Sequence, residues 1–168
     1  MFGEFIRGMS ERFAHRSTPP PVDLAAYRKS IELLTRRKVY NLYLSNEQDY
    51  SANAQKLDRL ENQASQLTPD AQELFAELGT LTSKDRITAG DARVEQTVTA
   101  ELQTSGMSEE MARQTRINGL VALCDFWQER FSDPQLSKGE SVLGRRRMMR
   151  ISARLNRLGF EDEPPPAA

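Results

Sequence analysis

The chain has 168 residues, one cysteine, and 23 Lys and Arg residues against 24 Asp and Glu residues, which gives a net charge of −1. This length is typical of one domain that buries enough apolar surface to fold without a disulfide or a structural metal ion. One cysteine excludes an intramolecular disulfide. No apolar run is long enough for a transmembrane segment, and charged residues interrupt what would be the apolar region of a signal peptide. We therefore expect a cytoplasmic protein.

The charges are divided unevenly along the chain. Residues 1–44 carry eight basic and four acidic side chains, residues 45–112 carry five basic and thirteen acidic, and residues 113–168 carry ten basic and seven acidic. An acidic middle between two basic ends allows ion pairing inside the molecule. It equally allows one basic surface that binds a polyanion, so both interpretations stay open.

Residues 1–16 predict a short amphipathic helix, and the three prolines in residues 17–21 predict a stiff extended spacer after it. The helix could fold back onto its own domain, dock into a protein partner or a second copy, or lie on a membrane surface. Its apolar face is our candidate partner-binding site, which consists of Phe2, Phe5, Ile6, Met9 and Phe13.

Residues 22–160 predict an all-α domain of five or six helices, because helical spacing of apolar residues recurs and strand alternation does not. No Gly or Pro occurs from Val22 to Thr68, so this stretch is one long helix or a helical hairpin. If it breaks or bends, we expect this near Ser45 and Asn46. Residues 161–168 are acidic and proline-rich and predict a disordered tail.

Thr68 and Pro69 are the clearest helix start in the chain, since a capping hydroxyl precedes a proline at the first helical position. We expect this helix to stop at Gly79. Gly90 should then interrupt the segment that follows. The helix that continues to residue 104 carries few apolar residues, and we expect it to be peripheral.

Residues 107–131 predict the central helix of the core. Ser108 is a plausible N-cap, and the helix should end before Pro134. Cys124 is either a reactive thiol or a small buried hydrophobe, and the absence of a nearby His or second Cys favours the second interpretation. The apolar face of this helix consists of Ile117, Leu120, Val121, Cys124, Trp127 and Phe131.

The last helix should begin at about Val142 or Arg145 and end at Leu158, before Gly159. Arginines repeat at helical spacing beside its apolar stripe, and arginine forks suit phosphates and carboxylates. This stripe is either a nucleic-acid contact or a solvated face paired with the acidic middle. The candidate nucleic-acid residues are Arg145, Arg146, Arg147, Arg150, Arg154 and Arg157.

Motifs of catalysis, metal binding and cofactor binding are absent from the sequence, and the sole histidine, His15, lies in the N-terminal segment. We therefore expect a non-enzymatic protein without cofactors. Our leading hypothesis is an adaptor, chaperone or assembly factor that holds a protein partner or self-associates. The excess of arginine over lysine fits a bacterial or phage protein. The alternative hypothesis is a nucleic-acid-binding accessory protein that uses the arginine-rich last helix.

Overall fold

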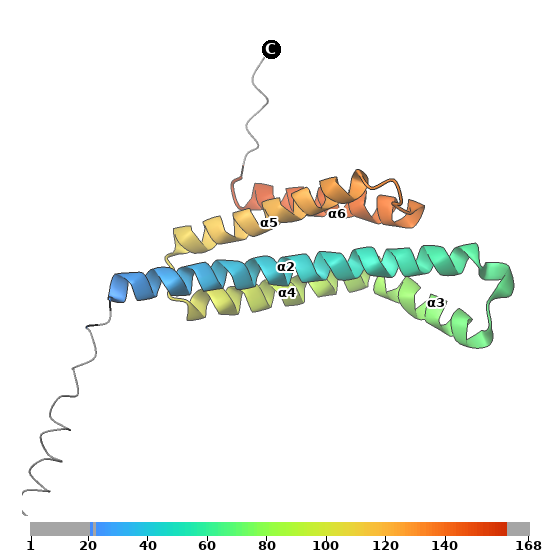
Figure 1. The fold of residues 1–168 in the computed structure, drawn as a ribbon, viewed down its shortest axis with the longest axis horizontal. Helices are drawn as coiled ribbons and strands as arrows, with labels where there is room; N and C mark the ends of the chain where they lie inside the picture. The colour runs from blue at the N-terminus through green and yellow to red at the C-terminus, as the bar shows by residue number, and fades with distance from the viewer. Residues whose placement is uncertain (1–20, 22, 161–168) are drawn as a thin grey trace, which may run out of the picture. The chain divides into compact units, whose positions relative to one another are not determined.

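The computed structural model describes residue 21 and residues 23–160, and these form helices, turns and loops without a strand (Figure 1). The predicted N-terminal helix, most of the spacer and the acidic tail lie outside the described residues. The all-α prediction for the domain is confirmed. Its elements are α2 (Leu24–Asn62), η1 (Ala64–Gln66), α3 (Pro69–Leu81), α4 (Lys84–Thr104), α5 (Glu109–Phe131) and α6 (Lys138–Arg157).

The chain divides into two units, residues 1–30 and residues 31–168, and the contacts described below lie within the second. Side-chain caps define where its helices begin, since α3, α4, α5 and α6 each follow a hydroxyl that accepts a backbone N–H. The predicted caps Thr68 and Ser108 are confirmed, and Ser83 and Ser137 are the other two. No helix of the described segments is long and apolar enough to cross a membrane.

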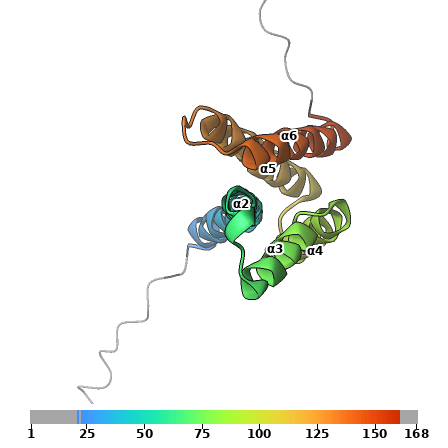
Figure 2. The same ribbon diagram turned by 90° about the vertical axis from the view of Figure 1, so that its right-hand side faces the viewer.

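The main core lies where α2, α4, α5 and α6 meet, and an end-on view shows these helices around a common centre (Figure 2). Trp127 of α5 is fully buried there, which confirms the prediction that this helix is central. Large aliphatic and aromatic side chains stabilise such a core by roughly 1.5–3 kcal/mol each. Its buried members are Val39, Tyr43, Val98, Leu102, Ile117, Leu120, Leu123, Trp127, Ile151 and Leu155.

The first long helix does not break. Helix α2 runs through Ser45 and Asn46, where the apolar pattern loses its phase. The pattern fails because polar side chains point inward in this stretch: Glu47 and Ser51 are buried among partners from other helices. A helix can therefore continue through a polar segment when its polar groups are satisfied inside the domain.

Two glycines do not act as the sequence predicts. Helix α3 continues past Gly79 to Leu81, and α4 passes through Gly90 without interruption. Gly90 is buried and allows close contact, since an added Cβ would lie 2.5 Å from the hydroxyl oxygen of Tyr50. Helix α4 is also not peripheral, because Val98 is fully buried.

The last helix begins earlier than expected, at Lys138, after the cap Ser137. The sequence predicts a linker from Leu136 to Gly144, because Gly139 and Gly144 lie there, but both glycines are in α6 and in close contact with other helices. An added Cβ at Gly144 would lie 2.6 Å from the Trp127 ring, so glycine allows α6 to approach α5. At Gly139 the backbone N–H donates to Asp58 of α2 at 3.1 Å.

Candidate functional site

A buried arginine on α6 joins four helices. The Arg147 guanidinium donates from Nε to Oε2 of Glu47 on α2 at 2.9 Å, and its terminal nitrogens lie 2.9 Å from the two oxygens of Asp91 on α4. Trp127 of α5 donates from its indole nitrogen to the same Glu47 oxygen at 2.8 Å. We call these four residues the buried junction. Arg147, Glu47 and Trp127 are fully shielded from solvent, so the charges of Arg147 and Glu47 must be compensated by partners inside the protein.

Within the buried junction, Arg147 and Asp91 stabilise each other's charged forms. Burial lowers the pKa of Arg147, but the hydrogen bonds and negative charges of Glu47 and Asp91 raise it further, so it lies above its ordinary value. Burial raises the pKa of Asp91, yet hydrogen bonds from Arg147 and Arg150 lower it below its ordinary value. Arg147 and Asp91 are therefore both charged at neutral pH.

A second carboxylate on α4, Glu95, is shared by donors from three helices. The Tyr43 hydroxyl of α2 and an Arg116 terminal nitrogen of α5 each lie 2.7 Å from it, and Arg154 of α6 also donates to it. Burial first, and then the charge of Glu95, raise the pKa of Tyr43, so the phenol remains a donor. Arg116 also donates to Thr99 at 2.8 Å, which leaves the guanidinium firmly oriented.

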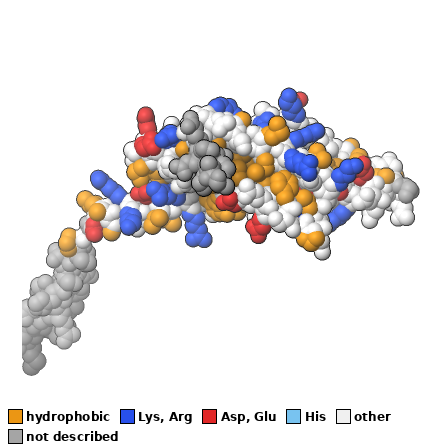
Figure 3. Space-filling view, turned by 90° about the horizontal axis from the view of Figure 1, so that it is seen from above, with side chains coloured by type: hydrophobic (Ala, Val, Ile, Leu, Met, Phe, Trp, Pro, Cys, Tyr) orange, Lys and Arg blue, Asp and Glu red, His pale blue; other side chains and the backbone are white. Residues whose placement is uncertain are grey.

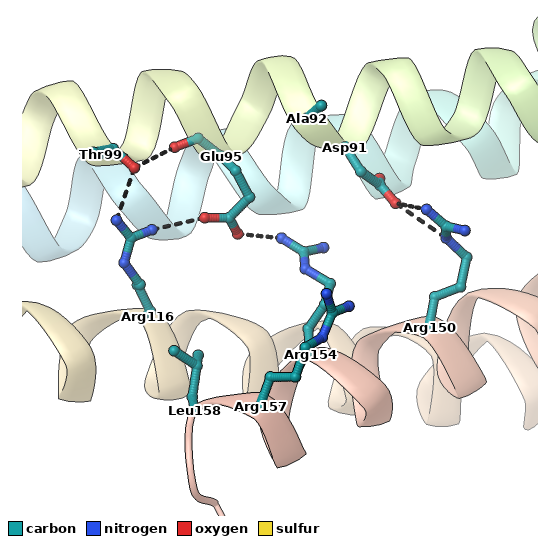
Figure 4. Close-up of a pocket in the computed structure, with 9 residues that line it drawn as sticks. All are labelled: Asp91, Ala92, Glu95, Thr99, Arg116, Arg150, Arg154, Arg157 and Leu158. Carbon is teal, nitrogen blue, oxygen red and sulfur yellow. Dashed lines mark hydrogen bonds and ion pairs between the residues drawn. The ribbon is translucent and has the colours of Figure 1, made fainter.

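Glu95, Arg116 and Arg154 line an open cleft of about 470 Å³, which lies between α4 on one side and α5 and α6 on the other. In Figure 4, Arg116, Arg150 and Arg154 reach from α5 and α6 toward the carboxylates of α4. We call it the arginine cleft. Its lining residues are Asp91, Ala92, Glu95, Thr99, Arg116, Arg150, Arg154, Arg157 and Leu158.

The arginine cleft carries more positive than negative charge. Four arginines line it against two carboxylates, and the Arg147–Glu47 pair behind Asp91 adds one charge of each sign. Two positive charges therefore remain among the described residues of the cleft. Arg157 carries much of this excess: its Nε donates to the Ala153 carbonyl at 3.3 Å, and no carboxylate of the described residues pairs with its terminal nitrogens.

The six arginines predicted to form one stripe have different environments. Arg147 is inside the core, whereas Arg150 and Arg154 pair with Asp91 and Glu95. Arg145 and Arg146 are exposed away from the cleft. Seen from the α5 and α6 side, Lys and Arg side chains lie among hydrophobic ones instead of in a single patch (Figure 3). Nucleic-acid binding by these arginines stays a prediction.

The spacing of α6 contained a signal for the buried arginine. Arg147 lies four residues before Ile151 and eight before Leu155, and both of these are buried. This places it on the apolar face of the helix rather than on the neighbouring polar stripe. The carboxylates that receive it could not be assigned from spacing alone, because Glu47 and Asp91 are 100 and 56 residues away in the sequence.

A separate groove lies between α2, α3 and the start of α6. It has a volume of about 490 Å³, and exposed apolar side chains form part of it, with Phe75 37% and Val142 47% exposed. Lys138 and Arg146 provide positive charge on the α6 side, and Asp58 and Glu61 provide negative charge on the α2 side. We call it the apolar groove, and its other lining residues are Ala54, Leu57, Gly79, Thr82, Gly139 and Leu143.

One buried carboxylate is only half satisfied. Glu140 of α6 accepts hydrogen bonds at Oε1 from Ser51, from Gln55 at 3.2 Å and from Arg130 at 2.8 Å. Its Oε2 atom is buried and has no partner among the described residues. These contacts attach the first turn of α6 to α2 and to the end of α5. Nowhere in the described ranges do three or more His, Cys, Asp or Glu side chains gather as metal ligands.

The predicted partner-binding residues Phe2, Phe5, Ile6, Met9 and Phe13 lie outside the described residues. Comparison of the chain with protein-family models, with curated proteins and with solved structures found no match. Among the described residues, the arginine cleft and the apolar groove are the two surfaces that bear on function.

Proposed function

We propose that the protein is a non-enzymatic interaction protein, an adaptor, chaperone or assembly factor, that holds a segment of a protein partner. The apolar groove is the observation that carries this proposal. Two of its apolar side chains, Phe75 and Val142, are exposed, although Ala54 and Leu143, which line the same groove, are buried. Apolar side chains that converge in a groove with a charged rim are typical of peptide-binding surfaces.

The chemistry of the groove favours an amphipathic helix as its occupant. Phe75 and Val142 offer contact to apolar anchors at helical spacing, since helices commonly bind grooves through residues three and four apart. Lys138 and Arg146 would pair with an acidic residue on the edge of that helix. The predicted apolar face Phe2–Phe13 of the N-terminal segment supplies a second surface for holding a partner.

Selection from a displayed peptide library tests the groove and does not require the natural partner. We expect selected peptides to carry apolar residues at helical spacing with an acidic flank. Val142→Glu should abolish their binding because it places a charge in the apolar groove. Met149→Glu is the matched control, since Met149 is 75% exposed on the same helix and does not line the groove. Peptides that bind both variants equally well would contradict the proposal.

The alternative is a nucleic-acid-binding accessory protein. It has weaker support, because Arg147 is buried and Arg150 and Arg154 form ion pairs with α4. Arg145, Arg146 and Arg157 remain exposed for phosphate contacts. This alternative requires affinity for DNA or RNA that falls steeply as salt rises, whereas the interaction proposal requires none.

A further inference from the structure

We propose that the arginine cleft binds the phosphate group of a small ligand. This inference is independent of the proposed partner groove, which lies between other helix faces. It begins from the charges of the cleft. The described carboxylates satisfy only part of its arginine side chains, and the remaining two positive charges match a phosphate monoester, which carries about −1.5 to −2 at neutral pH.

Internal ion pairing alone does not explain the arrangement. Asp91 is shared by Arg147 and Arg150, and Glu95 is shared by Arg116 and Arg154, so each carboxylate already serves two guanidinium groups. Like charges three or four residues apart on a helix repel each other. Arg157 adds such a charge next to Arg154, and no described carboxylate compensates it. An anion in the cleft would relieve this repulsion.

The donors are also held in place for an incoming anion. Arg116 is fixed by Glu95 and Thr99, and Arg150 is fixed by Asp91 through Nε and one terminal nitrogen. Fixed guanidinium groups lose little side-chain entropy when they bind an anion. Arg157 lines the cleft with Arg154 (Figure 4), and its terminal nitrogens have no ion-pair partner among the described residues, so they remain available for a ligand.

The size of the cleft favours a small molecule. A volume of about 470 Å³ is within the range of small-molecule sites, which is roughly 300–1,000 Å³. Leu158 also lines the cleft and adds an apolar surface, which suits the organic part of a phosphorylated compound. A nucleic-acid backbone carries the same phosphate chemistry, so the experiment must separate the two sources.

Isothermal titration with inorganic phosphate and with pyrophosphate, at low and constant ionic strength, tests the site in the full-length protein. We expect saturable binding, tighter for pyrophosphate because it carries more charge. Arg157→Gln should weaken it roughly tenfold, since it removes a charge-assisted hydrogen bond. The fold should survive, because Arg157 is exposed and forms no ion pair among the described residues.

Arg145→Gln is the matched control, because Arg145 is exposed on the same helix but does not line the cleft. The affinity of this variant for pyrophosphate should equal that of the wild type. Equal loss in both variants would mean nonspecific attraction to net charge and would overturn the site. Absence of saturable binding would overturn it too. A short single-stranded DNA that binds while both small phosphates fail would instead assign the arginines to a polynucleotide.

Discussion

Arg147 shows how one side chain can fix the arrangement of a four-helix core. It is fully buried, yet it contacts carboxylates from α2 and α4, and Trp127 from α5 donates to one of them. The net contribution of such a buried pair is small, because desolvation offsets the attraction between the charges. Removal of one partner has a much larger effect, since it leaves the other charges buried and unpaired.

Substitution Arg147→Met tests this dependence. The side chain keeps a similar apolar length, but Glu47 and Asp91 lose the charge that compensates them. We expect the free energy of unfolding in urea to fall by about 3–5 kcal/mol. Arg145→Met, at an exposed position of the same helix, should change it by less than about 0.5 kcal/mol. Similar values for the two variants would show that the buried junction is not needed for stability.

At the scale of the elements, glycines set how closely the helices approach. Gly144 and Gly79 both lie within helices, but their surroundings differ. An added Cβ at Gly144 would lie 2.6 Å from Trp127 and 2.9 Å from Phe131, whereas nothing lies within 4 Å of one at Gly79. In a helix, alanine is more favourable than glycine by about 1 kcal/mol. This gain is the same at both positions, so any difference between the two substitutions must come from the surrounding side chains.

We expect Gly144→Ala to destabilise the protein by about 1–3 kcal/mol, because the buried Trp127 ring cannot move without disturbing the core. Gly79→Ala should stabilise it by about 0.5–1 kcal/mol through reduced freedom of the unfolded chain. Thermal unfolding followed by circular dichroism compares the two variants directly. A stabilising effect at Gly144 would mean that α5 and α6 are not in close contact there.

The elements that the sequence predicts well are those whose signals are local. Ser108 caps α5, Thr68 and Pro69 start α3, and Trp127 lies in the core as its spacing indicates. The predictions fail where the burial of a residue, or the course of a helix, depends on side chains that are far away in the sequence. Glu47 looks like a surface residue, and Gly90 looks like a break, until a buried arginine and a tyrosine from other helices are placed beside them.

At the scale of the molecule, several carboxylates are each shared by donors from other helices. Glu47, Asp91, Glu95 and Glu140 each accept from at least two side chains on other helices. The acidic middle of the sequence therefore pairs in part with arginines of the last segment. This supports the first of the two interpretations of the charge division. The positive charge that this pairing does not compensate lies in the arginine cleft and on the exposed arginines.

The same contacts make stability depend on pH. The pKa of Asp91 is lower in the folded protein than its ordinary value, so the unfolded chain binds a proton more readily. Its stabilising contribution is therefore fully present above the ordinary pKa of about 4, and it is lost as pH falls through the lower folded value. We expect the free energy of unfolding in urea to decrease as the pH is lowered from about 5 to 3.

The variant Asp91→Asn separates this group from the other carboxylates. It should be less stable at neutral pH, because Arg147 and Arg150 lose a charged partner. Its stability should also decline less steeply with acid, because the group that titrates has been removed. A slope equal to that of the wild type would assign the acid sensitivity to other carboxylates. The slope is the decisive measurement, since any structural damage at this site lowers stability at every pH.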